Sequence, residues 1–486
     1  MRTRTLLTVL AAALLTSACV DEKVVFQDRE LFQDLPSSAA DFVGYTDQDD
    51  KLVVCGNCHI EKQGDWEATG HADAWAGLQD SGHSQTFCEG CHTVNGLGNP
   101  ADEGGYLATG DDRYLDVQCE SCHGPGLAHV ENPTDATIPD AALGVGTDAT
   151  QGCGECHQGT HHPFTEQWEE SGHAVVGFAA SREGCRSCHS GNGALEAWGI
   201  STSYAEQGQD LSITCAVCHD PHAQDHSGQL RFPVGGVAVE DNLCSQCHNR
   251  RAVPDPNSSH GLHPHSPETG LLSGDIGWFP PGLLIDRGEI VASHGDEGNE
   301  RLCAGCHVTQ STVSDAETGE FQFQAVGHGF NAIPCLDAQG IPTNQDCELS
   351  ISDRDFEAGC TASGCHTSAQ GAFSALSTAT VRLAALAEEL EELLAEVDPN
   401  GEGAGGEIDA ADGRFTAAEG AFFNLEVAAF GGTDRPDPRL TFAAAASHNP
   451  FLTEQLLIAS IQAVEDAYSV SASPGLALQR ELVSGR

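Results

Sequence analysis

The C-terminal part of the chain carries the clearest pattern of apolar and polar positions. Apolar residues recur there at helical spacing, at Leu376, Ala379, Leu383, Leu386, Leu390, Leu393 and Val397. This pattern predicts a helix with one apolar stripe, flanked by glutamates within positions 388–392. Asp398 and the Pro-Asn-Gly that follows predict the end of that helix, because proline and glycine do not continue a helical turn.

Two further helices are predicted downstream. Thr416 and Glu419 have the spacing of a capping box, which predicts a helix that runs on through Phe422, Phe423 and Val427. Another helix is predicted after Pro450, through Leu456, Ile458 and Val464. We expect residues 371–486 to form a helical domain that packs against the rest of the chain. Helices that pack only on each other, or a coiled-coil dimer, are the alternatives.

The N-terminus has the pattern of an export signal. Arg2 and Arg4 precede an apolar stretch from Leu6 to Leu15, and small residues follow at 16–18. The stretch is too short to span a bilayer, and no later segment is apolar enough. Cleavage before Cys19 would leave an N-terminal cysteine, so we expect a signal peptide at 1–18 and a lipid anchor at Cys19, on the outer or inner membrane. Plain secretion is the alternative.

A short cysteine motif dominates the middle of the chain. Cys-x-x-Cys-His occurs eight times, and a ninth, stretched copy runs from Cys360 to His366. This is the attachment signature of c-type haem: two thiols on one turn bind the same porphyrin, and the next histidine ligates its iron. Paired cysteines also occur in zinc sites, but zinc does not require a histidine after every second cysteine. For the stretched copy, zinc or a disulfide stays open.

The motif predicts about nine covalent haems in an exported protein. The expected attachment residues are Cys55, Cys58, Cys88, Cys91, Cys119, Cys122, Cys153, Cys156, Cys185, Cys188, Cys215, Cys218, Cys244, Cys247, Cys303, Cys306, Cys360 and Cys365. The expected proximal iron ligands are His59, His92, His123, His157, His189, His219, His248, His307 and His366. No catalytic residue is assigned.

Motif spacing indicates how the chain is organised. The first seven copies start 29 to 34 residues apart, which leaves too little polypeptide for a separate core around each haem. We therefore expect a mainly α fold with much irregular loop, in which packed haems form the core. The expected parts are a signal peptide 1–18, a linker 19–50, a seven-haem module 51–250, a two-haem module 251–370 and a helical domain 371–486.

The seven-haem module contains an internal repeat. Cys55, Cys88 and Cys119 reappear as Cys153, Cys185 and Cys215, at offsets of 98, 97 and 96 residues. The sequence around Trp66 and His71 matches the sequence around Trp168 and His173. These matches predict a duplicated three-haem unit.

The chain is strongly acidic, with a formal net charge of −51. This charge excludes a nucleic-acid partner, because phosphates would be repelled. A solvated surface and a docking surface for basic redox proteins remain open. Oligomeric state cannot be inferred.

Histidine supplies the sixth iron ligand in our prediction. The sole methionine is Met1, which leaves with the signal peptide, so methionine ligation is excluded. Fourteen histidines lie outside the motifs. Our choices for distal ligands are His71, His129, His162, His173, His222, His265, His294, His328 and His448, with His83, His226 and His263 as further candidates. Cys335 and Cys347 lie outside every motif, and we expect a disulfide between them.

Several runs resemble multihaem cytochromes of the cytochrome c554 type, within the wider set of hydroxylamine oxidoreductase-like and nitrite reductase-like proteins. They are Trp66 to His71, CESCHGPG at 119–126, CAVCHDPH at 215–222, the run 263–278 and SHNPF at 447–451. The resemblance implies stacked haems, helical connections and electron transfer.

Catalytic members of that superfamily keep one haem open, but the Cys-x-x-Cys-Lys site of its nitrite reductases is absent and no cross-linking tyrosine can be assigned. Electron transfer between redox partners is thus our expectation. An oxidoreductase with one open haem, acting on a small nitrogen or sulfur compound, is one alternative. A subunit of an extracellular cytochrome filament is the other.

Overall fold

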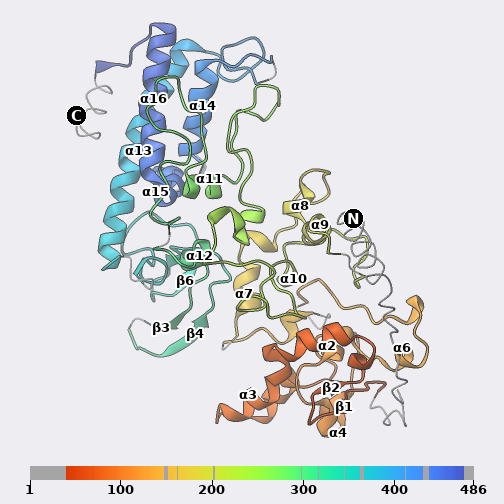
Figure 1. Ribbon diagram of the computed structural model, residues 1–486. Coiled ribbons are helices and arrows are strands. Elements are labelled where there is room, and N and C mark those ends of the chain that lie inside the picture. The colour runs from red at the N-terminus through yellow and green to blue at the C-terminus, as the bar shows by residue number, and fades with distance from the viewer. Residues whose placement is uncertain are drawn as a thin grey trace, which may run out of the picture. The chain divides into compact units, whose positions relative to one another are not determined.

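The computed structural model describes residues 40–146, 152–160, 162–200, 203–296, 298–315, 317–343, 345–361, 366–410, 412–430 and 437–474. Within these residues the fold is mainly α with long irregular connections, as expected (Figure 1). The helices before the C-terminal part are short: α2 (Ile60–Glu67), α3 (Ala74–Asp80), α4 (Gly105–Thr109), α5 (Cys119–His123), α6 (Leu127–Glu131), α7 (Phe164–Glu169), α8 (Arg186–His189), α9 (Gly191–Ala197), α10 (Cys215–Cys218), α11 (Glu268–Ser273) and α12 (Cys303–His307).

Strands occur only as three small antiparallel hairpins in the described residues. They pair β1 (Tyr45–Asp47) with β2 (Leu52–Val53), β3 (Ser311–Ser314) with β4 (Phe321–Ala325), and β5 (Cys335–Leu336) with β6 (Pro342–Thr343). The third hairpin contains the disulfide between Cys335 and Cys347, whose Cα atoms lie 5.9 Å apart. The predicted disulfide is therefore confirmed.

The eight unstretched Cys-x-x-Cys-His motifs each close into about one helical turn. In the first motif the amide of His59 donates to the carbonyl of Cys55 at 2.9 Å, and the amide of His157 donates to Cys153 at the same distance. The hydrogen bond fixes the motif histidine beside the turn that carries the two thiols. This compact turn lets one short segment offer two thiols and an imidazole to the same group.

The sequence repeat is also a structural repeat. The indole of Trp66 donates to the carbonyl of Val117 at 2.9 Å, and that of Trp168 donates to the carbonyl of Ile213 at 2.8 Å. The amide of Val117 in turn donates to His71, and the amide of Ile213 donates to His173. Each tryptophan thus ties its helix, α2 or α7, to the strand-like segment before the third motif of its unit, and the same bonds position His71 and His173.

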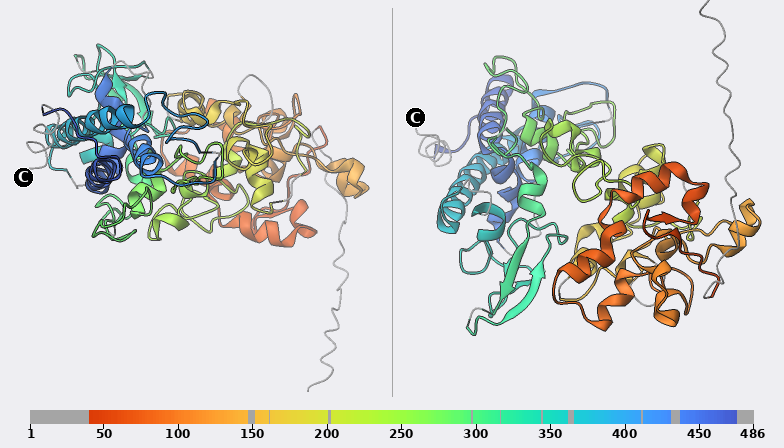
Figure 2. Two further views of the ribbon diagram at one scale, coloured as in Figure 1. Left: turned by 90° about the horizontal axis from the view of Figure 1, so that it is seen from above. Right: turned by 60° about the horizontal axis from the view of Figure 1, so that its bottom comes forward.

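The C-terminal helices are long and pack around their own core. They are α13 (Ala369–Val397), α14 (Ala417–Ala428), α15 (Ala443–His448) and α16 (Pro450–Tyr468), and Figures 1 and 2 show α13 and α16 side by side. Leu386, Leu390, Leu457 and Ile461 are fully buried in this core. The predicted packing against the rest of the chain is also present, because Leu262, which lies before these helices, belongs to the same core. A second, smaller cluster, which includes Leu271, also makes that contact, because the helices carry apolar residues on more than one face.

The ends of these helices follow their predicted caps. Thr416 and Glu419 form the capping box at the start of α14, with both reciprocal hydrogen bonds present. Asn449 caps α16 by accepting from the amide of Leu452, and Pro450 is its first residue. Because Asn449 ends α15 and begins α16, the chain turns sharply just after His448.

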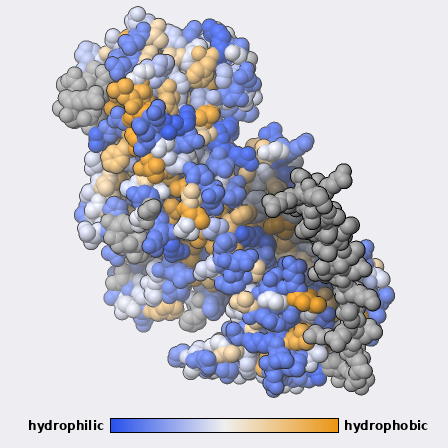
Figure 3. All heavy atoms as spheres, viewed as in Figure 1, coloured by the Kyte–Doolittle hydropathy of each residue, from blue (hydrophilic) through white to orange (hydrophobic). Residues whose placement is uncertain are grey.

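The surface agrees with the charge of the chain. Hydrophilic residues dominate the face shown in Figure 3, and apolar residues lie on it in small groups. Among the described residues, no helix combines the length and the apolar character needed to cross a membrane.

Candidate functional site

The nine motifs define nine sites, numbered 1 to 9 along the chain. Their motif histidines are, in order, His59, His92, His123, His157, His189, His219, His248, His307 and His366. In the described residues, the motif cysteines form no disulfides. Cys365 of site 9 lies outside the described residues, as does Cys19.

Eight motif histidines face a second histidine from elsewhere in the chain. The ring centres are 5.8 to 6.4 Å apart in the pairs His59–His129, His123–His222, His157–His71, His189–His265, His219–His328, His248–His173, His307–His448 and His366–His294. Two imidazole nitrogens that bind one metal from opposite sides, each at about 2 Å, put the ring centres about 6 Å apart. The pairs therefore fit a haem iron between them, with its porphyrin joined to the adjacent thiols.

Backbone carbonyls orient many of these rings. The Nδ1 atoms of His123, His219 and His307 lie 2.7, 2.6 and 2.8 Å from the carbonyl oxygens of Pro139, Gly228 and Phe330. A hydrogen bond from Nδ1 leaves Nε2 as the free ligand atom and fixes the ring plane.

The non-motif histidines are held in the same way. Nδ1 of His448 lies 2.8 Å from the carbonyl of Ala444 in the preceding turn, and Nδ1 of His294 lies 2.6 Å from the carbonyl of Ser447. These two partners come from α15, so this helix places His448 itself and also orients His294.

Burial keeps several of these rings neutral. Desolvation by burial, together with the positive charge of neighbouring histidines, lowers the pKa of His157, His173 and His448 to about 4. A neutral imidazole is the form that binds a metal.

Two carboxylates contact the sites and were not among the residues that sequence reasoning selected. Glu268 lies 3.5 Å from Nδ1 of His248, and this contact raises the pKa of the histidine. Asp220 lies 3.3 Å from Nδ1 of His222. Asp220 directly follows a motif histidine, which is a usable signal, whereas nothing in the sequence connects Glu268 to His248.

Site 2 differs from the other eight. Nδ1 of His92 lies 2.8 Å from the carbonyl of Ala74, so the ring is oriented as elsewhere. No distal ligand is assigned to this site from the described residues. Trp75, next to Ala74, packs against Tyr106 with ring centres 5.3 Å apart, and neither residue is the histidine that we expected as a distal ligand.

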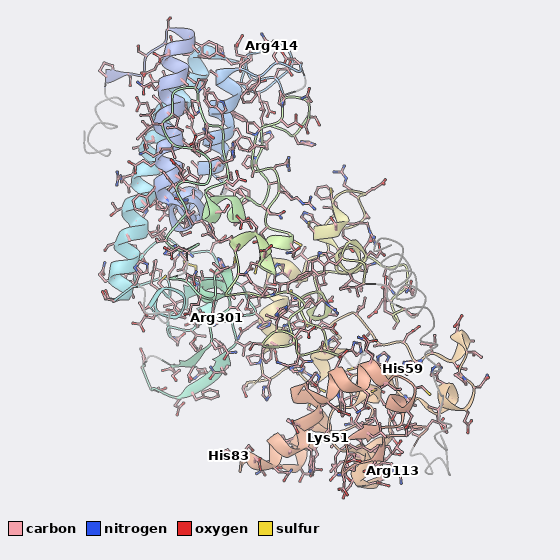
Figure 4. All side chains as sticks on the ribbon, viewed as in Figure 1. Lys51, His59, His83, Arg113, Arg301 and Arg414 are labelled. Carbon is pink, nitrogen blue, oxygen red and sulfur yellow. A yellow bond between two sulfur atoms is a disulfide. The ribbon has the colours of Figure 1, made fainter. Side chains whose placement is uncertain are left out.

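Three of the candidate distal histidines are not assigned to a site by a described histidine pair. His162 is exposed and follows the motif of site 4, where its charge contributes to the lowered pKa of His157. His83 is exposed beyond the end of α3, and Figure 4 shows it away from His59. His263 lies between two carboxylates, 3.0 Å from Glu402 and 3.2 Å from Glu426.

Comparisons with known proteins agree with the motifs. Residues 54–124 match the family model of cytochrome c554 and c-prime, and residues 206–253 match a model for the doubled CXXCH motif. The C-type polyheme cytochrome OmcB of Geobacter sulfurreducens is 26% identical over 267 residues, which are 46% of this chain and 31% of that protein. OmcC of the same species is 28% identical over 133 residues, 24% of this chain and 17% of that protein.

The chain thus spans about a third or less of the length of these relatives. Among solved structures, the outer cell wall cytochrome OcwA is similar with a TM-score of 0.42 and 19% identity, over 78% of this chain and 75% of that one. The relatives that match are polyhaem cytochromes and the family models describe haem attachment, so the chain is a multihaem c-type cytochrome.

Proposed function

We propose that the chain holds nine haem c groups and passes electrons between redox partners outside the cytoplasm. The observation that carries the proposal is the set of eight histidine pairs, each of which joins a motif histidine to a second histidine at the separation that one iron requires. Iron with two imidazole ligands is low-spin and has no free position for a substrate, which suits electron transfer.

In this proposal the chain's residues have three roles. The motif cysteines, including Cys360 and Cys365, hold the porphyrins. The motif histidines are the proximal ligands. The distal ligands are His71, His129, His173, His222, His265, His294, His328 and His448, and His162 is not assigned to a site.

Two measurements test the proposal. The intact mass of the mature protein should exceed that of the polypeptide by nine haems, and eight would mean that the Cys360 motif is not used. The electron paramagnetic resonance (EPR) spectrum of the oxidised protein should contain low-spin signals for eight irons. A spectrum dominated by high-spin iron would contradict the eight histidine pairs.

A second function concerns site 2, to which no distal ligand is assigned. An iron at site 2 with an open position could bind a small nitrogen or sulfur compound and exchange electrons with it. The test is a titration of the oxidised protein with cyanide and of the reduced protein with nitric oxide. One high-spin iron should convert per chain, and the Cys88→Ala/Cys91→Ala variant should lose that response together with one haem.

The outcome of the same titration separates a third possibility. If a histidine of a neighbouring chain completes site 2, as in a filament, this iron would be low-spin in concentrated samples and become high-spin on dilution. A high-spin signal that is independent of protein concentration supports the open site.

We also propose that Cys19 carries a lipid that anchors the protein to a membrane, from the Leu-Thr-Ser-Ala sequence that precedes it. The Cys19→Ser variant should be released from the membrane fraction, and its N-terminal peptide should lack the mass of the lipid. A variant that stays with the membrane would leave only plain export.

A further inference from the structure

Thiols of different motifs lie next to each other in a regular scheme. The first cysteines of sites 1 and 3, Cys55 and Cys119, pack against the same apolar cluster and lie close enough for each to shift the pKa of the other. The same mutual shift in pKa holds for Cys153 and Cys215 of sites 4 and 6. It holds again for the first cysteines of sites 7 and 8, which are Cys244 and Cys303. Since each thiol is a point of porphyrin attachment, these contacts mark neighbouring sites.

The second cysteines form another set of contacts. Cys91 of site 2 and Cys156 of site 4 lie close enough for each to shift the pKa of the other, and the same holds for Cys188 of site 5 and Cys247 of site 7. Backbone and side-chain contacts agree with both. The amide of Gly98, after motif 2, donates to the Glu155 carboxylate inside motif 4 at 2.5 Å. Arg250, two residues after motif 7, contacts the sulfur of Cys188 at 3.8 Å.

A third set joins the second cysteine of one site to a cysteine of a later one. Cys153 of site 4 lies close enough to Cys122 of site 3 for its charge to raise the pKa of Cys122. In the same way, the charge of Cys218 in site 6 raises the pKa of Cys244 in site 7. The pair Cys306 and Cys360 repeats the pattern between sites 8 and 9.

Side chains around the histidines give the same neighbours independently. Phe164 contacts His157 of site 4 and His328 of site 6, with ring centres 5.7 and 4.9 Å away. Phe330 contacts His328 of site 6 and His173 of site 7, at 5.7 and 4.5 Å. Sites 4, 6 and 7 therefore follow one another in space, with one phenylalanine at each junction.

The contacts continue to the end of the series. Glu268 binds His248 of site 7 and lies close enough to His448 of site 8 for a charge interaction. His294 of site 9 binds the carbonyl of Ser447, the residue before His448. The order 7, 8, 9 is thus supported by the ligands as well as by the thiols.

We propose that electrons follow one trunk through sites 1, 3, 4, 6, 7, 8 and 9, and that sites 2 and 5 are side positions attached to sites 4 and 7. The proposal rests on the proposed electron-transfer function and adds the route. Its basis is that the described thiol contacts of site 2 lead to site 4, and those of site 5 lead to site 7. An electron can therefore pass from one end to the other without visiting either side position.

The repeat explains why the side positions stop after site 5. Sites 1 to 3 and sites 4 to 6 are two units, and in each the middle site is the side position. The first and third motifs of these units start 64 and 62 residues apart, and the motifs of sites 7 and 8 start 59 apart. Sites 7 and 8 thus correspond to the first and third sites of a unit without a middle site, and site 9 corresponds to the first site of a fourth.

The exchange of ligands between units supports this correspondence. The first site of the second unit pairs with His71 of the first unit, and the first site of the third unit pairs with His173 of the second. Site 9 likewise pairs with His294, which lies between motifs 7 and 8 in the third unit. Each unit therefore supplies one histidine to the start of the next.

The route predicts where electrons can leave. Site 2, which has no assigned distal histidine in the described residues, is attached to the trunk at site 4. A small molecule that binds there would draw electrons from the trunk without interrupting it, since the step from site 3 to site 4 and onward does not use His92.

The test compares the removal of a trunk site with the removal of a side site in the full-length holoprotein. Asp49, exposed in the β1–β2 turn, is changed to cysteine and carries a photosensitiser that injects electrons near site 1. The substitution His294→Ala gives site 9 a distinct high-spin absorption band that reports the arrival of electrons. Cys215→Ala/Cys218→Ala then removes site 6, and Cys185→Ala/Cys188→Ala removes site 5.

Removal of site 6 should abolish the fast reduction of site 9. Removal of site 5 should lower the number of electrons that the chain holds by one while the fast reduction persists. The opposite result, or equal loss in both variants, would overturn the route. Absence of electron arrival even in the labelled parent would instead count against the proposed function.

A structural readout keeps the route testable if the variant without site 6 does not fold. In a density map of the parent holoprotein, iron 6 should lie between irons 4 and 7. Iron 2 should have iron 4 as its nearest neighbour, and iron 5 should have iron 7. Any other set of nearest neighbours would contradict the proposal.

Discussion

The rings of His307 and His448 lie 6.3 Å apart between centres and only 8° from parallel. His307 is the last residue of the eighth motif, whereas His448 is the last residue of α15. The pair connects the C-terminal helices to the motif-bearing part of the chain. The helices thus contribute a proposed ligand in addition to a core of their own.

This pair gives the first prediction. His448→Ala should convert one iron from low-spin to high-spin without loss of covalent haem, because the motif of site 8 is untouched. The EPR spectrum and the intact mass measure the two effects. His263→Ala is the matched control, since this histidine binds Glu402 and Glu426, and its spectrum should equal that of the parent. A His448→Ala spectrum without a new high-spin signal would refute the assignment.

The second prediction concerns Glu268, which contacts Nδ1 of His248. A carboxylate there strengthens the imidazole as a donor and favours oxidised iron, so Glu268→Gln should raise the midpoint potential of one haem. If the charged hydrogen bond favours the oxidised state by about 1.4 kcal/mol, the rise is about 60 mV for one electron.

Spectroelectrochemical titration measures the shift. Glu402→Gln, which removes a carboxylate from His263, should leave all midpoint potentials in place. Equal titration curves for Glu268→Gln and the parent would show that the carboxylate does not tune site 7.

The third prediction concerns stability and pH. Asp437 accepts from the amides of Leu349 and Arg439, and the guanidinium of Arg439 lowers its pKa to about 2. Asp437→Ala should therefore reduce the free energy of unfolding at pH 7 by about 1–3 kcal/mol. Because the folded-state pKa is depressed, the contribution is present above about pH 4 and is lost as the pH falls through about 2.

Urea denaturation of parent and variant at several pH values checks this, and the difference should shrink in acid. Asp412→Ala is the matched control, because Asp412 pairs with Arg414 at the same spacing but on an exposed side chain. Its effect should be much smaller than that of Asp437→Ala, because water and salt screen an exposed ion pair. A loss at Asp437 that does not depend on pH would argue against the ion pair as its cause.

The fourth prediction concerns the disulfide between Cys335 and Cys347, which closes a loop with a sequence separation of 12. Its removal by Cys335→Ser/Cys347→Ser should lower the free energy of unfolding by about 2–3 kcal/mol. The loop should keep its course, because Arg354 also binds the carbonyls of Ile333, Cys347 and Glu348. Haem content should be unchanged, and a variant that loses haem 9 would show that the disulfide is needed for haem attachment.

The sequence predicted those features that depend on short range. The capping box at Thr416, the start of α16 at Pro450 and the turn of each motif follow from residues within a few positions of one another. The repeat likewise predicted that His71 and His173 are equivalent, and the same tryptophan hydrogen bonds position both.

The pairing of histidines could not be predicted, because it depends on where remote segments meet. Eight of the nine histidines selected as distal ligands do face a motif histidine, but no pattern in the chain connects His328 with site 6 or His448 with site 8. Site 2 shows the limit most clearly. A surplus of histidines predicted a partner for His92, whereas its surroundings in the described residues are aromatic and aliphatic.

The transfer of His71, His173 and His294 to the unit that follows each of them has a consequence for biogenesis. The first sites of the second, third and fourth units depend on a histidine of the preceding unit, so a fragment that begins at one of these units would carry a haem with a vacant side. During export each of these three histidines leaves the cytoplasm before the motif whose iron it would bind. Maturation of these three sites should therefore depend on the preceding unit, and shortened forms made by proteolysis or truncation would leave the first site of the fragment without its distal histidine.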